Sequence, residues 1–335
     1  MIFLGDICHP FDQKPDFNIL QQLKEPGESI IGNLEGPLLD SEEFATFDGV
    51  FNNISILEEF KKLNFSAVTV SNNHFFDFPD YVHSTISTLE NQDISVIGTT
   101  EYKYRIMHEN GIKYALINAG WEMIGVSKKN IEGHELNLMN TNQLLALVSK
   151  IKITAEIDVI VVILHWNYEL EYYPHPGQRQ LAQKLIDEGA NFVIGHHPHI
   201  IGPVEEYKQG RIFYSLGNWC VPHKVYYNGK LKYGSESNRQ YILKINNVQD
   251  FQLYSIMFNP IDNSYADLCI ASDPERLELP IDQYTTFFRK NRRKGKGLPI
   301  YQNFDRGWKN TFKNLIVKSR APMVKLVNKI LFKGI

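Results

Sequence analysis

The chain has 335 residues, a net charge of −3 and an apolar fraction of 43%, which are ordinary values for a soluble globular protein with one large domain or two. Its three cysteines lie far apart in the sequence, which argues against a disulfide framework and favours a reducing compartment. We find neither an apolar run of about 18 residues nor the charged and apolar segments of a signal peptide, so the sequence predicts no membrane-spanning helix and no secretion signal.

Apolar runs alternate with amphipathic segments through most of the chain. The runs typical of strands are Ile2–Asp6, Ser29–Asn33, Ala67–Ser71, Ser95–Ile97, Ile157–His165 and Asn191–Ile194. The segments typical of helices are Ser55–Lys62, Tyr81–Glu90, Thr141–Lys152 and Gln178–Glu188. This alternation indicates βαβ units and therefore strands that are largely parallel.

Two hairpins and a group of late strands interrupt the alternation. The predicted hairpins have turns at Asn110-Gly111, between Tyr104–His108 and Lys113–Asn118, and at Gln209-Gly210, between Val204–Lys208 and Arg211–Leu216. The late strands, which have no helices between them, are Arg239–Ile245, Phe251–Phe258 and Ala266–Ile270. The sequence therefore predicts an α/β fold with mixed sheets, not a plain doubly wound sheet.

The charge is distributed unevenly along the chain. Residues 289–335 contain fourteen lysines and arginines and one acidic residue, whereas the rest of the chain carries a net charge of −16. Apolar residues recur at helical spacing on both sides of Pro322, which predicts two short amphipathic helices with basic polar faces. Such helices are typical of a membrane surface, and packing against the acidic body is the alternative. We predict a domain at 1–280 and a basic helical extension at 281–335.

Three of the eleven histidines fall within the five residues Gly195–His199, directly after a strand-like run. Imidazole is the commonest protein ligand for transition metals, and open α/β sheets place their sites just past strand ends. Because a residue before proline favours an extended conformation, His197 and His199 are expected on one side of the chain and His196 on the other.

Polar residues that can bind metal also follow other predicted strands, and we expect them to converge on one rim of a single sheet. Two divalent ions about 3.5–4 Å apart need a carboxylate that bridges them, together with imidazole and neutral oxygen ligands. Mixed nitrogen and oxygen ligands favour Mn, Fe or Zn. The candidates are Glu35 as bridge, Asp6, His165, His197 and His199 as terminal ligands, Asn73 as an amide ligand, and His74 as the acid that protonates the leaving group.

The motifs occur in a fixed order, which is Gly5-Asp6, Asn33-Leu34-Glu35-Gly36-Pro37, Asn72-Asn73-His74, Leu164-His165-Trp166, Gly195–His199 and Tyr214-Ser215-Leu216-Gly217-Asn218. This set resembles the CapA family of bacterial capsule and poly-γ-glutamate synthesis proteins, within the calcineurin-like metallophosphatase superfamily. The resemblance implies a four-layer α/β/β/α sandwich of two mixed sheets and a dinuclear metal site. By motif position it implies the ligands and the catalytic histidine that are named above.

Two positions depart from the superfamily pattern. The first motif normally reads Asp-x-His, but the third position here is Cys8 and the histidine follows at His9. Either residue can ligate, or the first metal position can be weak or empty. Glu35 stands where the superfamily usually has aspartate, as is usual in CapA proteins. The backbone must compensate for the extra methylene, because metal–ligand distances tolerate only about 0.2 Å.

Other polar residues receive supporting roles. We expect His196 to lie behind the ligands, Asn33 and Asn72 to hold turns, and Asp77 to cap the helix after Pro79 rather than to orient His74. Trp121-Glu122 and Asn218-Trp219 follow further strands and either line the pocket or pack in the core. The remaining histidines are predicted at the surface, and they are His83, His108, His134, His175 and His223.

Two functions fit these features. The first is a hydrolase with one or two divalent ions (Mn, Fe or Zn) that acts on phosphoesters in capsule or anionic surface-polymer biosynthesis. The second is a non-catalytic accessory protein of capsule or polyglutamate assembly with a degenerate metal site. The predicted location is the cytoplasm, with contact to the inner membrane surface through the tail. Nucleic acid is a weak candidate partner, because the tail has aromatic residues but no recognised nucleic-acid motif.

Overall fold

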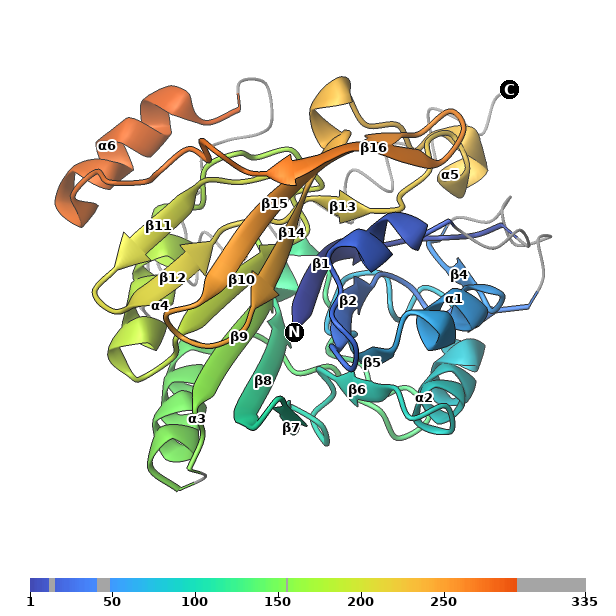
Figure 1. The fold of residues 1–335 in the computed structure, drawn as a ribbon. Coiled ribbons are helices and arrows are strands. Elements are labelled where there is room, and N and C mark those ends of the chain that lie inside the picture. Colours follow the sequence, from blue (N-terminus) through green and yellow to red (C-terminus); the bar gives the residue numbers. More distant parts are fainter. Residues whose placement is uncertain (12–15, 41–48, 155, 294–335) are drawn as a thin grey trace.

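The computed structural model describes residues 1–11, 16–40, 49–154 and 156–293. Most of the described strands form two sheets that pack face to face (Figure 1). The first sheet has the order β16 (Ser264–Ile270), β15 (Phe251–Asn259), β14 (Arg239–Ile245), β1 (Ile2–Ile7), β2 (Ile30–Leu34), β5 (Phe65–Thr69) and β6 (Ser95–Ile97), and β13 (Asn218–Trp219) pairs with β1. The second has the order β11 (Val204–Tyr207), β12 (Gly210–Phe213), β10 (Phe192–His196), β9 (Val159–His165), β8 (Ile112–Gly120) and β7 (Tyr104–Glu109).

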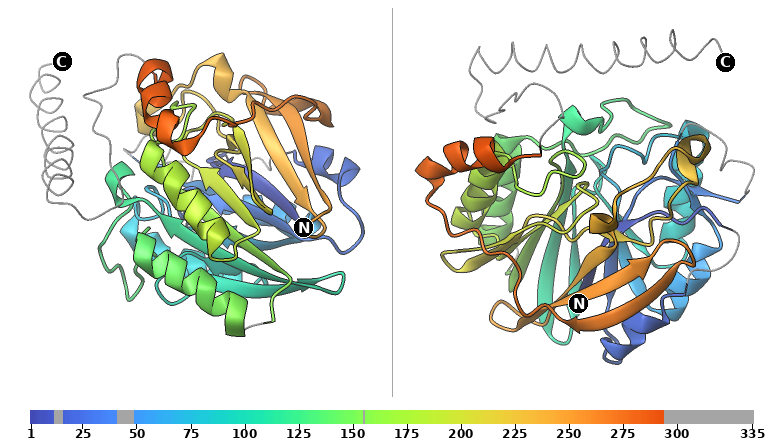
Figure 2. Two further views of the ribbon diagram at one scale, coloured as in Figure 1. Left: turned by 90° about the vertical axis from the view of Figure 1, so that its left-hand side faces the viewer. Right: turned by 90° about the horizontal axis from the view of Figure 1, so that it is seen from above.

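Helices cover the outer face of each sheet, as the view from above shows (Figure 2). On the first sheet these are α1 (Ile56–Lys62) and α2 (Val82–Glu90), and on the second they are α3 (Thr141–Thr154), α4 (Pro176–Asp187) and α6 (Ile281–Asn291). A third cluster of buried apolar side chains fills the space between the sheets. The predicted four-layer α/β/β/α sandwich of two mixed sheets is therefore confirmed.

The strand β9 shows why the sequence folds in this way. Every residue of β9 is buried, as expected for a strand with both faces covered. Val159, Val161 and Ile163 belong to the cluster between the sheets, whereas the alternate residues Ile160, Val162 and Leu164 belong to the cluster under the helices. A continuous apolar run thus supplies two layers of core and ends in a polar residue at the sheet edge.

Within the described residues, the strands and helices predicted from the sequence are present, and their ends differ by a few residues. In the first hairpin, Asn110 and Gly111 both have positive φ (51° and 79°), as a type I′ turn requires. In the second hairpin the predicted turn is off by one residue, because Tyr207 pairs with Gly210. Gly210 lies within β12, where a Cβ atom would collide with the side chain of Ile186.

The segment predicted as a separate extension begins with a helix that is packed on the domain. In α6, Tyr284 and Phe288 are fully buried in the cluster over the second sheet, and the Tyr284 hydroxyl donates a hydrogen bond to the carbonyl of Pro174 (2.7 Å). The two predicted basic amphipathic helices lie outside the described residues, so the domain boundary stays a prediction. No described helix is both long enough and apolar enough to cross a membrane.

Candidate metal centre

The predicted ligands come from both sheets, at the edge where their strands end. Asp6 lies in β1 and Glu35 follows β2 in the first sheet. His165 ends β9, and the loop with His197 and His199 follows β10, in the second sheet. The prediction that one sheet supplies all of them is therefore wrong. The site lies across the interface, with carboxylates from one sheet and imidazoles from the other.

Two groups of three residues could each hold a metal ion. One is Glu35, His165 and His197, and the other is Asp6, Glu35 and His199. Within each group the candidate ligand atoms all lie within 4.8 Å of one another, and every member is buried. Glu35 belongs to both groups, which is the arrangement that a bridging carboxylate requires.

The carboxylate of Glu35 is buried and incompletely satisfied. Its Oε1 lies 3.6 Å from Nε2 of His165 and 3.9 Å from Nε2 of His199. No described residue forms a hydrogen bond with this oxygen. Burial, and then the negative charge of Asp6, raise the pKa of Glu35 well above its usual value. A buried carboxylate oxygen that faces two imidazoles without a hydrogen bond is what a metal ligand looks like before the ion is added.

Asp6 ties the two sheets together. Its Oδ1 accepts a hydrogen bond from the amide of Asn33 (2.8 Å), and its Oδ2 accepts one from the backbone N–H of His197 (3.0 Å). Nδ1 of His196 lies 3.1 Å from Oδ1, and Nδ1 of His199 lies 3.5 Å from Oδ2. Burial acts to raise the pKa of Asp6, but contact with His196 and the neighbouring histidines outweighs it and lowers the pKa.

The histidine loop reaches the site by a different route from the one predicted. His197 and His199 have φ values of 92° and 59°, so this segment is not extended, and the Asp6 carboxylate holds the His197 amide. Both imidazoles still reach Glu35 or its partners, as expected, and His196 contacts Asp6 behind them. Gly195 is required because a Cβ atom there would collide with the Tyr214 carbonyl and the Trp166 indole.

The remaining candidate residues either lie beside the predicted ligands or hold them in place. The amide oxygen of Asn73 lies 2.8 Å from Nε2 of His165, which places it beside the first group. The prediction that Asn33 holds a turn is wrong. Its amide oxygen accepts hydrogen bonds from the side chains of Thr69 (3.1 Å) and Asn72 (3.3 Å), so it orients Asp6 from a fixed position. Asn72 caps the turn by accepting the backbone N–H of His74 (3.1 Å), as predicted.

His74 is oriented by Asp77, and the prediction that Asp77 caps the following helix is wrong. Nδ1 of His74 lies 2.7 Å from Oδ2 of Asp77, and that oxygen also accepts the backbone N–H of Val50 (2.9 Å). The short helix at Pro79–Tyr81 has no side-chain cap. The hydroxyl of Tyr227 lies 3.3 Å from the same ring nitrogen.

Cys8 and His9 lie outside both ligand groups. The Cys8 thiol donates weak hydrogen bonds to the Glu35 carbonyl (3.6 Å) and to Oε2 of Glu35 (3.8 Å). Burial, and then Glu35, raise the pKa of Cys8 well above its usual value, which favours the thiol over the metal-binding thiolate. Nδ1 of His9 lies 3.5 Å from Sγ of Cys220.

The chemistry of the donors fits divalent transition metals. Burial, and then His199, lower the pKa of His197 to about 3, and burial also lowers the pKa of His165 well below its usual value. Both rings are therefore neutral imidazoles, which is the form that binds metal. Together with two carboxylates and an amide oxygen, this mixed donor set suits Mn, Fe or Zn better than Mg or Ca.

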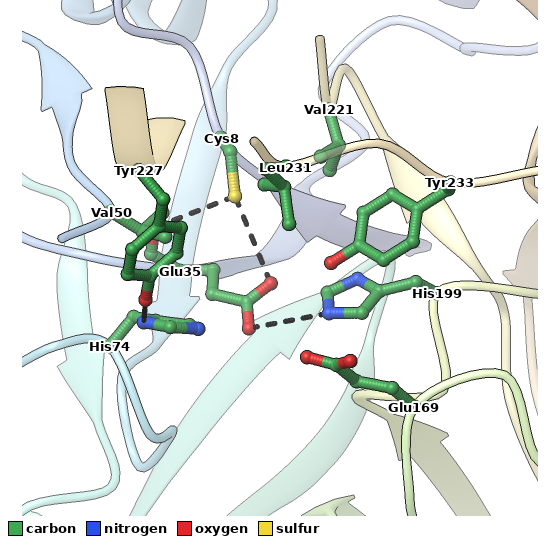
Figure 3. Close-up of a pocket in the computed structure, with 10 residues that line it drawn as sticks. All are labelled: Cys8, Glu35, Val50, His74, Glu169, His199, Val221, Tyr227, Leu231 and Tyr233. Atoms are coloured by element: carbon green, nitrogen blue, oxygen red, sulfur yellow. Dashed lines mark hydrogen bonds and ion pairs between the residues drawn. The ribbon is translucent and has the colours of Figure 1, made fainter. Parts of the chain in front are cut away.

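A cavity of about 120 Å³ opens beside Glu35 (Figure 3). It is lined by Cys8, Glu35, Val50, His74, Glu169, His199, Val221, Tyr227, Leu231 and Tyr233. The sequence reasoning missed three of these polar residues, Glu169, Tyr227 and Tyr233. The tyrosines lie in or near the four-residue helix α5 (Tyr226–Gly229), which has no periodic signal, and Glu169 follows His165 in an irregular loop.

Two other expectations are settled here. Asn218 supports the site, because its amide oxygen lies 2.8 Å from Nδ1 of His199, whereas Trp219 and Trp121 are core residues. The prediction that His175 is a surface residue is wrong. It is buried between Trp121, Tyr168 and Phe288, and burial lowers its pKa to about 3.

A model of the family described as "Bacterial capsule synthesis protein PGA_cap" matches residues 7–222. The chain belongs to this family. The predicted family is thus confirmed, and the matched segment contains all the candidate ligands except Asp6.

PGA biosynthesis protein CapA of Bacillus subtilis is 27% identical to this PGA_cap protein over 254 residues, 72% of this chain and 64% of the relative. Capsule biosynthesis protein CapA of Bacillus anthracis is 31% identical over 204 residues, 57% of this chain and 49% of the relative. The PGA_cap chain therefore spans about half to about two thirds of the length of these relatives.

Solved structures align with most of this chain at low sequence identity and with TM-scores below 0.5. The calcineurin-like phosphoesterase YfkN from Bacillus subtilis aligns with 95% of the PGA_cap chain and 98% of its own, with a TM-score of 0.45 and 14% identity. The NAD nucleotidase of Haemophilus influenzae aligns with 96% of this chain and 60% of its own, with a TM-score of 0.44 and 13% identity.

Proposed function

We propose that this PGA_cap protein is a metal-dependent hydrolase of phosphoesters that acts in the assembly of a capsule or another anionic surface polymer. One observation carries the proposal. The buried Glu35 carboxylate belongs to two candidate ligand groups at once and has an oxygen without a hydrogen bond among the described residues. The names of the two Bacillus relatives support the assignment to capsule and PGA biosynthesis.

In this proposal Glu35, His165 and His197 would hold one ion, and Asp6, Glu35 and His199 would hold the other. A pair of divalent ions supplies an activated water and stabilises the oxygens of an in-line displacement. Asn33 fixes Asp6 within the first sheet, and the hydrogen bond from the His197 amide to Asp6 must break if that sheet shifts relative to the histidine loop. The residues thus present a site of fixed geometry, which lowers the cost of reorganisation.

His74 is placed to protonate the leaving oxygen. Asp77 holds Nδ1 of its ring, and Figure 3 shows the other ring nitrogen directed towards Glu35. A positioned acid of this kind contributes about 10²- to 10⁴-fold to a rate. The Tyr227 hydroxyl near Nδ1 adds a second contact that restricts the ring.

The test has two parts. The purified full-length protein is loaded with Mn²⁺ or Zn²⁺, its metal content is measured by mass spectrometry, and hydrolysis of bis(p-nitrophenyl) phosphate is followed. We expect about two ions per chain and activity that falls in His197→Ala, whereas His108→Ala, which changes an exposed histidine on β7, serves as the matched control. A metal-loaded protein that hydrolyses no phosphoester would overturn the proposal.

The second candidate function is a non-catalytic accessory role in polymer assembly. The observation that favours it is Cys8, because a protonated thiol lies against Glu35 at the motif position where the superfamily has histidine. Unchanged capsule output from a Glu35→Ala, His197→Ala double variant would support this role over hydrolysis.

A further inference from the structure

The two candidate ligand groups each contain a histidine that faces Glu35, and the two rings are held in different ways. We call the group of Glu35, His165 and His197 the His165 position, and the group of Asp6, Glu35 and His199 the His199 position. The Nε2 atom faces Oε1 of Glu35 in both, at 3.6 Å from His165 and 3.9 Å from His199. A neutral imidazole carries its hydrogen on one nitrogen and binds an ion through the other. The neighbours of each ring therefore decide whether its Nε2 is available.

The hydrogen of His199 is held on the nitrogen that faces away from Glu35. Its Nδ1 lies 2.8 Å from Oδ1 of Asn218 and 3.5 Å from Oδ2 of Asp6. An amide oxygen and a carboxylate oxygen both accept hydrogen bonds, so together they keep the hydrogen on Nδ1. Asn218 is fixed beside Asp6 by the parallel pairing of β13 with β1. Nε2 of His199 then keeps the free lone pair that a ligand needs.

The orientation of the Asn33 amide is set by Asn72. The Asn72 Oδ1 accepts the backbone N–H groups of His74 (3.1 Å) and Phe75 (2.9 Å), and its Nδ2 donates to the carbonyl of Leu34 (2.8 Å). These backbone contacts admit one orientation of the Asn72 amide. The same Nδ2 donates to Oδ1 of Asn33 (3.3 Å). Asn33 must therefore turn its oxygen towards Asn72 and its NH2 group to the opposite side.

The NH2 group of Asn33 meets the ring of His165. Its Nδ2 lies 2.8 Å from Oδ1 of Asp6 and 3.4 Å from Nδ1 of His165. Because an amide NH2 group only donates, Nδ1 of the neutral ring must accept, and the ring hydrogen lies on Nε2. Oδ1 of Asn73, 2.8 Å from this Nε2, is placed to accept that hydrogen. The nitrogen of His165 that faces Glu35 is therefore the one that carries the hydrogen.

We propose that Asn33 is a positioning residue that makes the two metal positions unequal. It holds the hydrogen of His165 on Nε2, so the His165 position would stay closed until that hydrogen is lost and another is taken up at Nδ1. The ring stays neutral in this exchange. The His199 position would accept an ion directly. This inference rests on the ligand groups of the proposed function and adds an order of binding to them.

The size of the difference follows from the contact that is lost. A hydrogen on Nδ1 of His165 would face the NH2 group of Asn33, and both residues are buried. Leaving one buried donor unpaired should weaken binding at the His165 position by about 10- to 100-fold relative to the His199 position.

The first test locates the ring hydrogens by NMR in the metal-free full chain at about pH 8, where histidine side chains are ordinarily neutral. The histidine side chains are labelled with ¹⁵N and assigned by signal loss in His165→Gln and His199→Gln. We expect the hydrogen on Nε2 of His165 and on Nδ1 of His199. Asn33→Asp replaces the NH2 group with an oxygen and should move the His165 hydrogen to Nδ1. Thr69→Val is the matched control, because it removes only a donor to Oδ1 of Asn33 (3.1 Å), and it should keep the wild-type pattern.

The second test is calorimetric titration of the same proteins with Mn²⁺ or Zn²⁺. The wild type and Thr69→Val should bind two ions in separate steps, the second about 10- to 100-fold weaker, and in Asn33→Asp the ratio of the two Kd values should move towards one.

The outcomes separate this inference from the proposed function. A hydrogen on Nδ1 of His165 in the wild type, two steps of equal affinity, or an Asn33→Asp spectrum like that of the wild type would each overturn the role of Asn33, whatever the protein hydrolyses. The expected hydrogens and unequal steps in a protein without phosphoesterase activity would overturn the proposed function alone. If Asn33→Asp does not fold, the wild-type spectrum still decides, because the inference requires the hydrogen of His165 on Nε2.

Discussion

Two buried glutamates allow a direct test of the metal centre. The same substitution, glutamate to glutamine, should change the unfolding free energy of the metal-free protein differently at the two positions. Glu205 is paired with Arg179 through two contacts (2.7 and 2.9 Å) and also accepts hydrogen bonds from Tyr214 (2.5 Å) and Gln183 (2.7 Å). Among the described side chains, the only cationic partners of Glu35 are histidines. Its Oε1 forms no hydrogen bond with any described residue. We therefore compare Glu35→Gln with Glu205→Gln.

The expected magnitudes follow from these contacts. Removing one partner of a buried ion pair costs about 3–5 kcal/mol, so Glu205→Gln should lower the free energy of unfolding by that amount with or without metal. In the metal-free protein, Glu35→Gln removes a buried carboxyl group that has an unsatisfied oxygen, and we expect the unfolding free energy to stay equal or to rise by about 1–3 kcal/mol. With metal at about 100 times its Kd, each ion stabilises the wild type by about 2.7 kcal/mol. Because Glu35 is shared by both groups, Glu35→Gln should forfeit up to about 5 kcal/mol.

The assay is urea unfolding followed by circular dichroism, with each protein measured in EDTA and again with Mn²⁺ or Zn²⁺. We expect Glu35→Gln to have an unfolding free energy equal to or higher than that of the wild type in EDTA and a lower one with metal. Glu205→Gln should have a lower unfolding free energy than the wild type by the same amount in both conditions. A wild type that metal does not stabilise would refute the assignment of the ligand groups. A Glu35→Gln variant that is much less stable than the wild type in EDTA would show that the carboxylate has a structural partner instead.

Three further predictions concern the acid, a buried histidine and the tail. His74→Ala should lower kcat by about 10²- to 10⁴-fold without changing the metal content, and Asp77→Asn should lower it less; loss of metal from either variant would contradict the assigned roles. His175 has a folded pKa of about 3 against an ordinary value of 6.5, so the unfolded chain binds the extra proton and stability falls as pH drops from 6.5 towards 3. Between pH 7 and pH 4 the wild type should lose about 3 kcal/mol more than His175→Phe in urea unfolding, and parallel losses would refute this. The full chain should bind vesicles that contain phosphatidylglycerol, and binding should weaken with salt and be lost on truncation after Arg293. Equal binding by the truncated chain would exclude the tail as the contact.

The elements that could be predicted from sequence are those whose signal is local. Strand β14 was predicted with the observed ends, and the Asn110-Gly111 turn has the predicted positive φ at both residues. Apolar periodicity and turn chemistry depend on neighbours in the chain, so they can be recognised without knowledge of the tertiary fold. The site motifs were found for the same reason, because each follows a recognisable strand.

What the sequence could not show depends on contacts between distant segments. The rule that strand ends converge applies to one sheet, and nothing local says that β9 and β10 belong to a different sheet from β1 and β2. The sequence around His175 does not indicate that it is buried. The burial comes from Phe288 of α6, which lies more than a hundred positions later in the chain. Glu169 could have been suspected from its place four residues after a predicted ligand, but the loop that carries it is held by Arg293, more than a hundred positions later.

The division of the ligands between two sheets links the chemistry of the site to the stability of the fold. The carboxylates of Asp6 and Glu35 belong to the first sheet, and the imidazoles that face them belong to the second. Apolar packing between the sheets sets their separation, and the hydrogen bond from the His197 amide to Asp6 fixes their register at this edge. An ion bound by both halves would join the sheets and would stabilise only the folded state, because the unfolded chain does not bring these residues together. Metal affinity and unfolding free energy should therefore change together, which is why Glu35 reports on both.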